Sequence, residues 1–157
     1  MFGTNVLILS VLPYSGTPYH GFAIQKDTKE TVEEYLFHAL EKTHLIESRK
    51  TCNFSKCGRT DKGVSAFGNV VSVDIRMIPS RYDAHCSRLT QINVHHRHLI
   101  IIVDRDERVP ANVYLLGILN KVLPDTIRIT GADYVDSAFS ARFSCKSRCY
   151  KYLLFEV

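Results

Sequence analysis

The hydrophobic pattern of the chain divides it into short strands and two amphipathic helices. Residues 6–12 form an almost continuous apolar run, which predicts a mostly buried strand. Val71, Val73 and Ile75 alternate with polar neighbours, as they do in a strand that buries one face. Three further strands are predicted from apolar and aromatic residues of high β propensity, at residues 52–56, 127–130 and 148–155.

Two helices are predicted between these strands. Thr31 and Glu34 have the spacing of a capping box, and apolar residues then recur on one helical face. A second helix is predicted over residues 112–122, with Pro124 as its stop. The order strand, helix, strand, strand, helix, strand, strand indicates an α+β fold, a ferredoxin-like split βαβ antiparallel sheet with helices on one face. The other face of the sheet is expected to be free for binding or packing.

Length and composition limit the possibilities without deciding the function. The 157 residues suit a single domain, and the charge of +4, from 20 Lys and Arg against 16 Asp and Glu, permits nucleic-acid binding without requiring it. Five cysteines without regular spacing favour free thiols in a reducing compartment. No apolar stretch reaches the length of a membrane helix, so no membrane partner is expected.

Residues 77–110 differ in composition from the rest of the chain. They contain no lysine, and they gather four histidines and a cysteine around an apolar run at residues 99–103. The spacing of these histidines matches no standard zinc pattern, so no metal site is predicted. The segment is expected to be an atypical insertion with one added strand.

One glycine-bounded segment carries the clearest candidate chemistry. Gly58 and Gly63 permit a sharp turn and the close approach of a bulky ligand. Between them Arg59 and Lys62 flank Asp61, which sets one carboxylate between two cations that would attract a polyanion. Judged by these features alone, a surface turn with a local ion pair is the simpler interpretation. The surrounding sequence favours a functional one.

Four segments of the chain, in order, resemble a known family. Residues 57–68 read CGRTDKGVSAFG, which is similar to the signature loop of the TruA family of tRNA pseudouridine synthases. Residues 14–22 resemble the first strand and loop of that family, and residues 119–128 and 137–152 follow its order and approximate spacing. The sequences of residues 57–68 and 137–145 are most similar to the eukaryotic branch of the family, which modifies tRNA positions 38 and 39. The resemblance does not extend over residues 77–110.

The resemblance implies a reaction and the residues that perform it. Asp61 is implied to be the catalytic carboxylate in the isomerisation of uridine to pseudouridine in the anticodon stem-loop of tRNA. Because this reaction gains and loses no atoms, no cofactor or metal is expected. Arg59 is implied to hold the flipped base out of the helix. Tyr150 is implied to pack against the target uracil, although a buried strand aromatic is an equally good interpretation of that residue alone.

Weaker assignments concern the basic surface around Asp61. Arg142 is similar in position to a family arginine near the cleft, where it would pair with a phosphate or carboxylate. Lys62 and His20 are candidate RNA contacts. Further lysine and arginine side chains would contribute affinity without reading sequence, namely Lys146, Arg148 and Lys151.

The resemblance also sets expectations for the whole protein. tRNA is the expected partner, a homodimer is implied by the family, and the expected location is the nucleus, the cytoplasm or both. Family members continue into a second half, so residues 1–157 are expected to be a single N-terminal domain that is inactive alone. The alternative is a non-catalytic ferredoxin-like RNA-binding module, and a mere dimerisation fragment is a structural rival. Asp61 separates these hypotheses, because binding by stacking needs no carboxylate.

Overall fold

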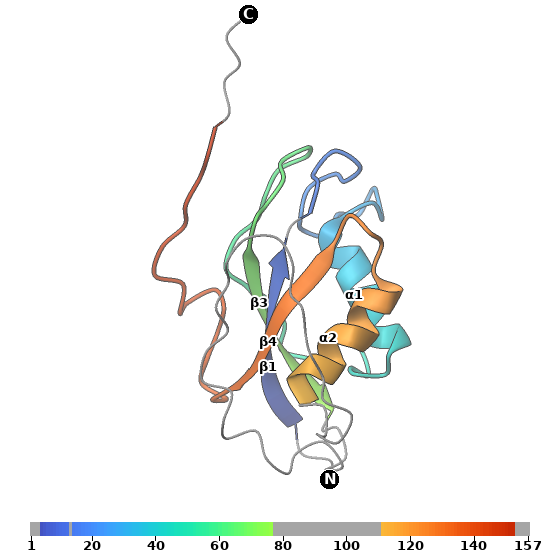
Figure 1. Cartoon of the computed structure of the whole chain (residues 1–157), viewed down its shortest axis with the longest axis vertical. Coiled ribbons are helices and arrows are strands. Elements are labelled where there is room, and N and C mark those ends of the chain that lie inside the picture. Colours follow the sequence, from blue (N-terminus) through green and yellow to red (C-terminus); the bar gives the residue numbers. More distant parts are fainter. Residues whose placement is uncertain (1–3, 13, 77–110, 153–157) are drawn as a thin grey trace, which may run out of the picture.

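Helices and strands follow one another in the order β1, α1, β2, β3, α2 and β4 (Figure 1). The computed structural model describes residues 4–12, 14–76 and 111–152. The strands are β1 (Thr4–Leu12), β2 (Ser55–Lys56), β3 (Asn69–Arg76) and β4 (Arg128–Val135), and the helices are α1 (Val32–Lys42) and α2 (Ala111–Val122).

The four strands form one antiparallel sheet in the order β2-β3-β1-β4. In its centre Leu7 of β1 faces Val73 of β3 on one side and Tyr134 of β4 on the other. Since β3 lies antiparallel to both β1 and β2, those two strands run parallel to each other with β3 between them. Both helices lie on the same face of this sheet (Figure 1). The predicted α+β class is therefore confirmed.

Helix α1 begins at the predicted cap, but only half of the capping box forms. The Thr31 side chain accepts a hydrogen bond from the Glu34 backbone N–H at 3.3 Å. The Glu34 carboxylate turns to Arg49 instead, whose two terminal nitrogens donate to it at 2.5 and 2.8 Å. Leu36 and Leu40 are fully buried, as the predicted apolar face requires. An ion pair has thus replaced the second half of the cap.

Helix α2 packs against β4 and is joined to it by one side chain. Leu115 and Leu119 are fully buried, which confirms the predicted apolar face. The Asn120 amide donates to the Ile129 carbonyl at 2.7 Å and accepts from the Ile129 N–H at 2.8 Å. These two hydrogen bonds satisfy both polar backbone groups of Ile129, and they tie α2 to the first residues of β4.

Two strand predictions need correction. The predicted strand at residues 52–56 pairs only at Ser55–Lys56, although the Cys52 carbonyl still accepts from Asp74 N–H at 2.8 Å. The strand predicted at residues 148–155 is wrong for its described part, because residues 148–152 run away from the sheet without strand pairing (Figure 1). Aromatic, β-prone sequence is not sufficient for a strand when no partner strand edge lies beside it.

The open face of the sheet is partly covered. Ser72, a polar position expected to face solvent, is only 2% exposed, because the turn at residues 140–143 packs over β3. Its hydroxyl accepts a hydrogen bond from the Ala141 N–H at 3.1 Å. The predicted insertion at residues 77–110, with its histidines and added strand, lies outside the described residues.

Candidate active site

The signature loop turns at the residue that carries the candidate carboxylate. The Val64 N–H donates to the Asp61 carbonyl at 3.1 Å, and Gly63 adopts φ +80°. A positive φ at the third position of a four-residue turn is the geometry of a type II turn, which glycine adopts without strain. The turn therefore presents the exposed Asp61 and Lys62 side chains to solvent at the tip of the loop.

A second loop, residues 14–22, clamps the signature loop along its length. Tyr14 and Ala66 exchange backbone hydrogen bonds at 3.2 and 3.3 Å, and the Phe22 N–H donates to the Thr60 carbonyl at 3.0 Å. Between these points the Gly16 N–H donates to the Ser65 hydroxyl at 2.9 Å. The two segments that most resemble the family are therefore one structural unit, in which residues 14–22 fix the backbone on both sides of Asp61.

Two glycines of residues 14–22 are needed for this close approach. A Cβ on Gly16 would lie 2.3 Å from the carbonyl carbon of Val64, a distance that no side chain tolerates. Gly21 has φ +98°, and a Cβ there would lie 2.8 Å from the Thr60 carbonyl oxygen. Both positions bring backbone directly against the backbone that carries Asp61.

Buried aromatic side chains support the loop from below. Tyr14 is 1% exposed and its hydroxyl shares a 2.6 Å hydrogen bond with the Thr60 hydroxyl, next to Asp61 in sequence. Burial raises the pKa of the Tyr14 phenol above its ordinary value, while the hydrogen bond from Thr60 opposes that rise. Phe22 is fully buried beside Tyr14, with 6.1 Å between ring centres. Phe22 therefore has a packing role.

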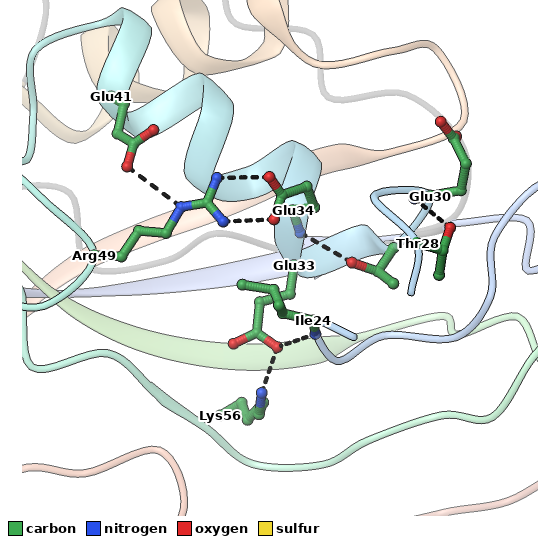
Figure 2. A network of polar contacts seen from close by, with 9 residues as sticks. Ile24, Thr28, Glu30, Glu33, Glu34, Glu41, Arg49 and Lys56 are labelled. Carbon is green, nitrogen blue, oxygen red and sulfur yellow. Dashed lines mark hydrogen bonds and ion pairs between the residues drawn. The ribbon is translucent and has the colours of Figure 1, made fainter. Parts of the chain in front are cut away.

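A buried ion pair holds the strand that leads into the loop. The Lys56 ammonium contacts the Glu33 carboxylate of α1, and their side chains are only 18% and 7% exposed (Figure 2). The same Glu33 oxygen accepts from the Ile24 N–H at 3.0 Å. Since Lys56 directly precedes Cys57, this contact joins the start of the signature loop to α1 and, through Ile24, to the segment that follows residues 14–22.

A groove of about 880 Å³ lies between the signature loop and residues 139–152. Arg59 and Asp61 line one wall, and Tyr150 lines the other. Tyr150 is 68% exposed, so the interpretation as a core aromatic is wrong for this residue. Phe67 adds a second exposed ring to the lining. The groove thus offers the Asp61 carboxylate, the Arg59 guanidinium, which has no protein partner among the described residues, and aromatic faces for stacking.

Three of the predicted site residues lie away from this groove lining. Arg142 sits in the turn at residues 140–143, with its guanidinium 5.2 Å from the centre of the Phe143 ring and its N–H bonded to the Ser55 hydroxyl. Lys62 is exposed in the turn at residues 61–64. His20 lies within residues 14–22, where its N–H donates to the Glu30 carbonyl and its carbonyl accepts from the Gln25 amide. Neither Arg59 nor Lys62 makes an ion pair with Asp61 in the described part of the chain, so the local ion pair of the simpler interpretation is absent.

Two structural residues of the site escaped the sequence interpretation. The Arg148 guanidinium donates to the Cys57 carbonyl from Nε at 2.8 Å and from a terminal nitrogen at 2.5 Å. Asn69 is 5% exposed and donates to the Gly58 carbonyl at 3.1 Å. In the sequence Arg148 is one of several basic residues between positions 146 and 151, and Asn69 follows the loop without a recognisable motif. Sequence spacing alone does not reveal either contact, because each bridges segments distant in sequence.

Within the described ranges, no cluster of three or more His, Cys, Asp or Glu side chains has the arrangement of a metal site. The histidines of residues 77–110 fall outside those ranges. Neither described helix has the length and apolar character needed to cross a bilayer.

The antiparallel α+β domain therefore carries an exposed carboxylate on a loop that faces a wall of aromatic and basic side chains. The chain is 44% identical over 143 residues to the tRNA pseudouridine(38/39) synthase of Bos taurus, a match that covers 90% of this chain and 27% of that protein. It is 36% identical over 149 residues to the tRNA pseudouridine(38/39) synthase of Saccharomyces cerevisiae, covering 89% of this chain and 28% of that protein. The tRNA pseudouridine synthase A of Methanosarcina mazei is 34% identical over 143 residues, with 91% and 40% covered.

These similarities extend over about nine tenths of the chain, and they confirm that its motifs resemble those of the tRNA pseudouridine synthases. No protein-family model matches the chain. The chain spans between a fifth and a half of the length of the curated relatives it matches.

Proposed function

We propose that the groove between the signature loop and residues 139–152 is the site at which a tRNA uridine, at position 38 or 39 of the anticodon stem-loop, becomes pseudouridine. One observation carries the proposal: an exposed carboxylate, Asp61, stands on a doubly clamped loop and lines the same groove as Arg59 and Tyr150. The names of the relatives supply the substrate class.

The reaction moves the ribose attachment of the base from N1 to C5. The N1–C1′ bond breaks, the freed uracil turns, and a C5–C1′ bond forms; the C5 hydrogen leaves and N1 gains a proton, so composition is unchanged. In the proposal Asp61 is the carboxylate that acts on the sugar or the base and helps to move the proton. Its position on a turn held by backbone bonds on both sides gives the fixed geometry that such chemistry requires.

A paired uridine must leave the helical stack before Asp61 reaches it, at a cost of a few kcal/mol. In the proposal the planar Arg59 cation fills the vacated stack, and the Tyr150 ring covers the flipped base. The exposure of both side chains fits this proposal, since each is available to a ligand in the free protein. Lys62 at the loop tip is a proposed phosphate contact, and Arg142 and His20 are proposed contacts at the edges of the bound RNA.

The direct test is tritium release from tRNA that carries C5-labelled uridine. The segment of the Saccharomyces cerevisiae relative that aligns with this chain is replaced by the corresponding residues of this chain, and this chimera and the isolated chain are assayed in parallel. Asp61→Asn is expected to abolish release by the chimera while leaving tRNA binding intact. Asp133→Asn, an exposed carboxylate on β4 outside the groove, is the matched control and is expected to retain release.

Two outcomes would defeat the proposal. Equal release from the Asp61→Asn chimera would mean that the carboxylate does no chemistry. tRNA binding without any release from the unsubstituted chimera would favour the non-catalytic RNA-binding module. Homodimer formation and a nuclear or cytoplasmic location are further proposals that rest on the family; light scattering after size exclusion and imaging of the tagged protein test them.

A further inference from the structure

The groove wall that carries Tyr150 is attached to the rest of the molecule in two places. The upstream attachment is the turn at residues 140–143, where Ala141 is buried and its N–H bonds to the Ser72 hydroxyl at 3.1 Å. The Ser140 and Ser55 hydroxyls lie 2.9 Å apart there. These contacts fix the base of the wall on β2 and β3, before it rises along the groove.

The second attachment is Arg148. Among the described residues, its two hydrogen bonds to the Cys57 carbonyl are the polar contacts that join residues 145–152 to the signature loop. A Cβ at position 58 would lie 3.6 Å from Arg148 Nε, in ordinary van der Waals contact, so this approach does not depend on the glycine there. Cys57 lies two residues before Arg59 and Arg148 lies two before Tyr150. The contact therefore spans the groove between the two proposed substrate-binding side chains.

We propose that Arg148 is a positioning residue that latches the wall bearing Tyr150 to the loop bearing Arg59 and Asp61. The role of Arg148 in positioning the substrate-binding side chains rests on the proposed function. The latch itself, the pair of hydrogen bonds from Arg148 to the Cys57 carbonyl, does not depend on that function. Without Arg148 the wall keeps its anchor at residues 140–143, but Tyr150 loses its fixed distance from Asp61. Catalysis depends on such alignment, and misplacement by about 1 Å costs as much as 100-fold in rate.

The geometry distinguishes a latch from a contact to RNA phosphate. A phosphate contact depends on positive charge, which lysine also provides. The latch depends on the fork of the guanidinium, because two nitrogens donate to one carbonyl oxygen, and lysine presents a single ammonium instead. Arg148→Lys keeps the charge and removes the fork, so it separates the two roles. Lys151→Gln, an exposed residue of the same wall, removes a charge without touching the latch.

The first experiment uses the free chain and needs no activity. Backbone ¹⁵N heteronuclear NOE values are measured for residues 145–152 in the unsubstituted, Arg148→Lys and Lys151→Gln chains. The latch predicts lower values at residues 146–152 in Arg148→Lys only, with residues 14–22 and the sheet unchanged. Equal values in all three chains would overturn the latch, whatever the chimera does.

The second experiment measures kcat, KM and salt dependence in the chimera with the Saccharomyces cerevisiae relative. Arg148→Lys is expected to lower kcat about 10- to 100-fold with little change in KM. The slope of log Kd for tRNA against log salt is expected to stay unchanged in Arg148→Lys. If Arg148→Lys retains kcat, and Arg148→Gln reduces the slope by about 0.7 to 0.9, the residue is a phosphate contact and positioning is overturned. An inactive unsubstituted chimera would count against the proposed function, and the NOE result would still decide the latch.

Discussion

The buried Lys56–Glu33 ion pair is expected to be the most sensitive charged contact of the described fold. The two side chains are 18% and 7% exposed, so both charges have lost most of their water. Lys56→Met keeps the aliphatic stem between the Phe22 and Phe54 rings, which each lie 5.8 Å from the ammonium. Among the described residues, it leaves the Glu33 carboxylate with the Ile24 N–H as its hydrogen-bond donor, at 3.0 Å (Figure 2).

The expected cost follows from that uncompensated charge. Removing one partner of a buried pair costs about 3–5 kcal/mol, and the exposure of Lys56 places this case near 3. For a domain of this size the loss corresponds to about 6–12 °C in Tm, at about 2–4 °C per kcal/mol. Adding Glu33→Gln removes the charge but keeps an acceptor for Ile24. The double variant is therefore expected to lose less than about 1.5 kcal/mol, which is less than the Lys56→Met variant alone.

Urea unfolding followed by far-UV circular dichroism measures these free energies of unfolding. The control is Arg76→Met, which breaks an exposed pair with Glu47, where the charged atoms lie 4.0 Å apart and the side chains are 53% and 78% exposed. That variant is expected to lose less than about 1 kcal/mol. The reasoning is refuted if Lys56→Met costs no more than this control, or if the double variant costs the sum of the two single ones.

Three further predictions concern the loops and the ionisable groups. Gly16→Ala is expected to destabilise the chain by at least about 2 kcal/mol, because its Cβ would meet the Val64 backbone. Gly117→Ala, which has open space around it in α2, is expected to stabilise the chain by up to about 1 kcal/mol. Thermal unfolding measures both changes. Burial raises the pKa of Tyr14 above the ordinary 10.0, so the folded state holds the phenol proton more tightly than the unfolded state does. The stability that the protonated Tyr14 contributes is therefore lost as pH rises above 10. Tyr14→Phe should flatten the fall in the free energy of unfolding in that pH range. The hydrogen bond from Arg49 lowers the pKa of Glu34 below 4.5, so the stability that ionised Glu34 contributes is present above that pH and is lost as pH falls. Glu34→Gln should flatten the fall in the free energy of unfolding on the acid side. An unchanged slope would contradict the stabilising role of the Arg49–Glu34 pair.

Local pattern was sufficient for much of the fold. The spacing of Leu36, Leu40, Leu115 and Leu119 reflects helix periodicity, and each of these residues is fully buried as predicted. A helix face is determined by residues three and four apart, so a short window of sequence contains the information. The alternation at Val71, Val73 and Ile75 predicted β3 for the same reason.

Non-local contacts explain the predictions that failed. Ser72 is buried because the turn at residues 140–143 packs over it, and its hydroxyl accepts a hydrogen bond from the Ala141 N–H. Residues 148–152 are aromatic and β-prone, yet they run beside the groove rather than in the sheet. Each of these outcomes depends on residues far away in the sequence, so a short window of sequence does not contain the information needed to predict it.

The sequence by itself indicated the glycine-bounded loop that carries Asp61, the order of the elements from β1 to β4, and the resemblance to tRNA pseudouridine synthases, because residue types and short spacings encode these directly. Only the tertiary structure decided that residues 14–22 and the signature loop form one clamped unit around Asp61. It also decided that Tyr150 faces a groove and that Arg148 bonds to Cys57, across 91 positions of sequence. Such contacts arise when the chain closes on itself, and their partners are chosen by packing and by unsatisfied carbonyl groups that exist only in the folded protein.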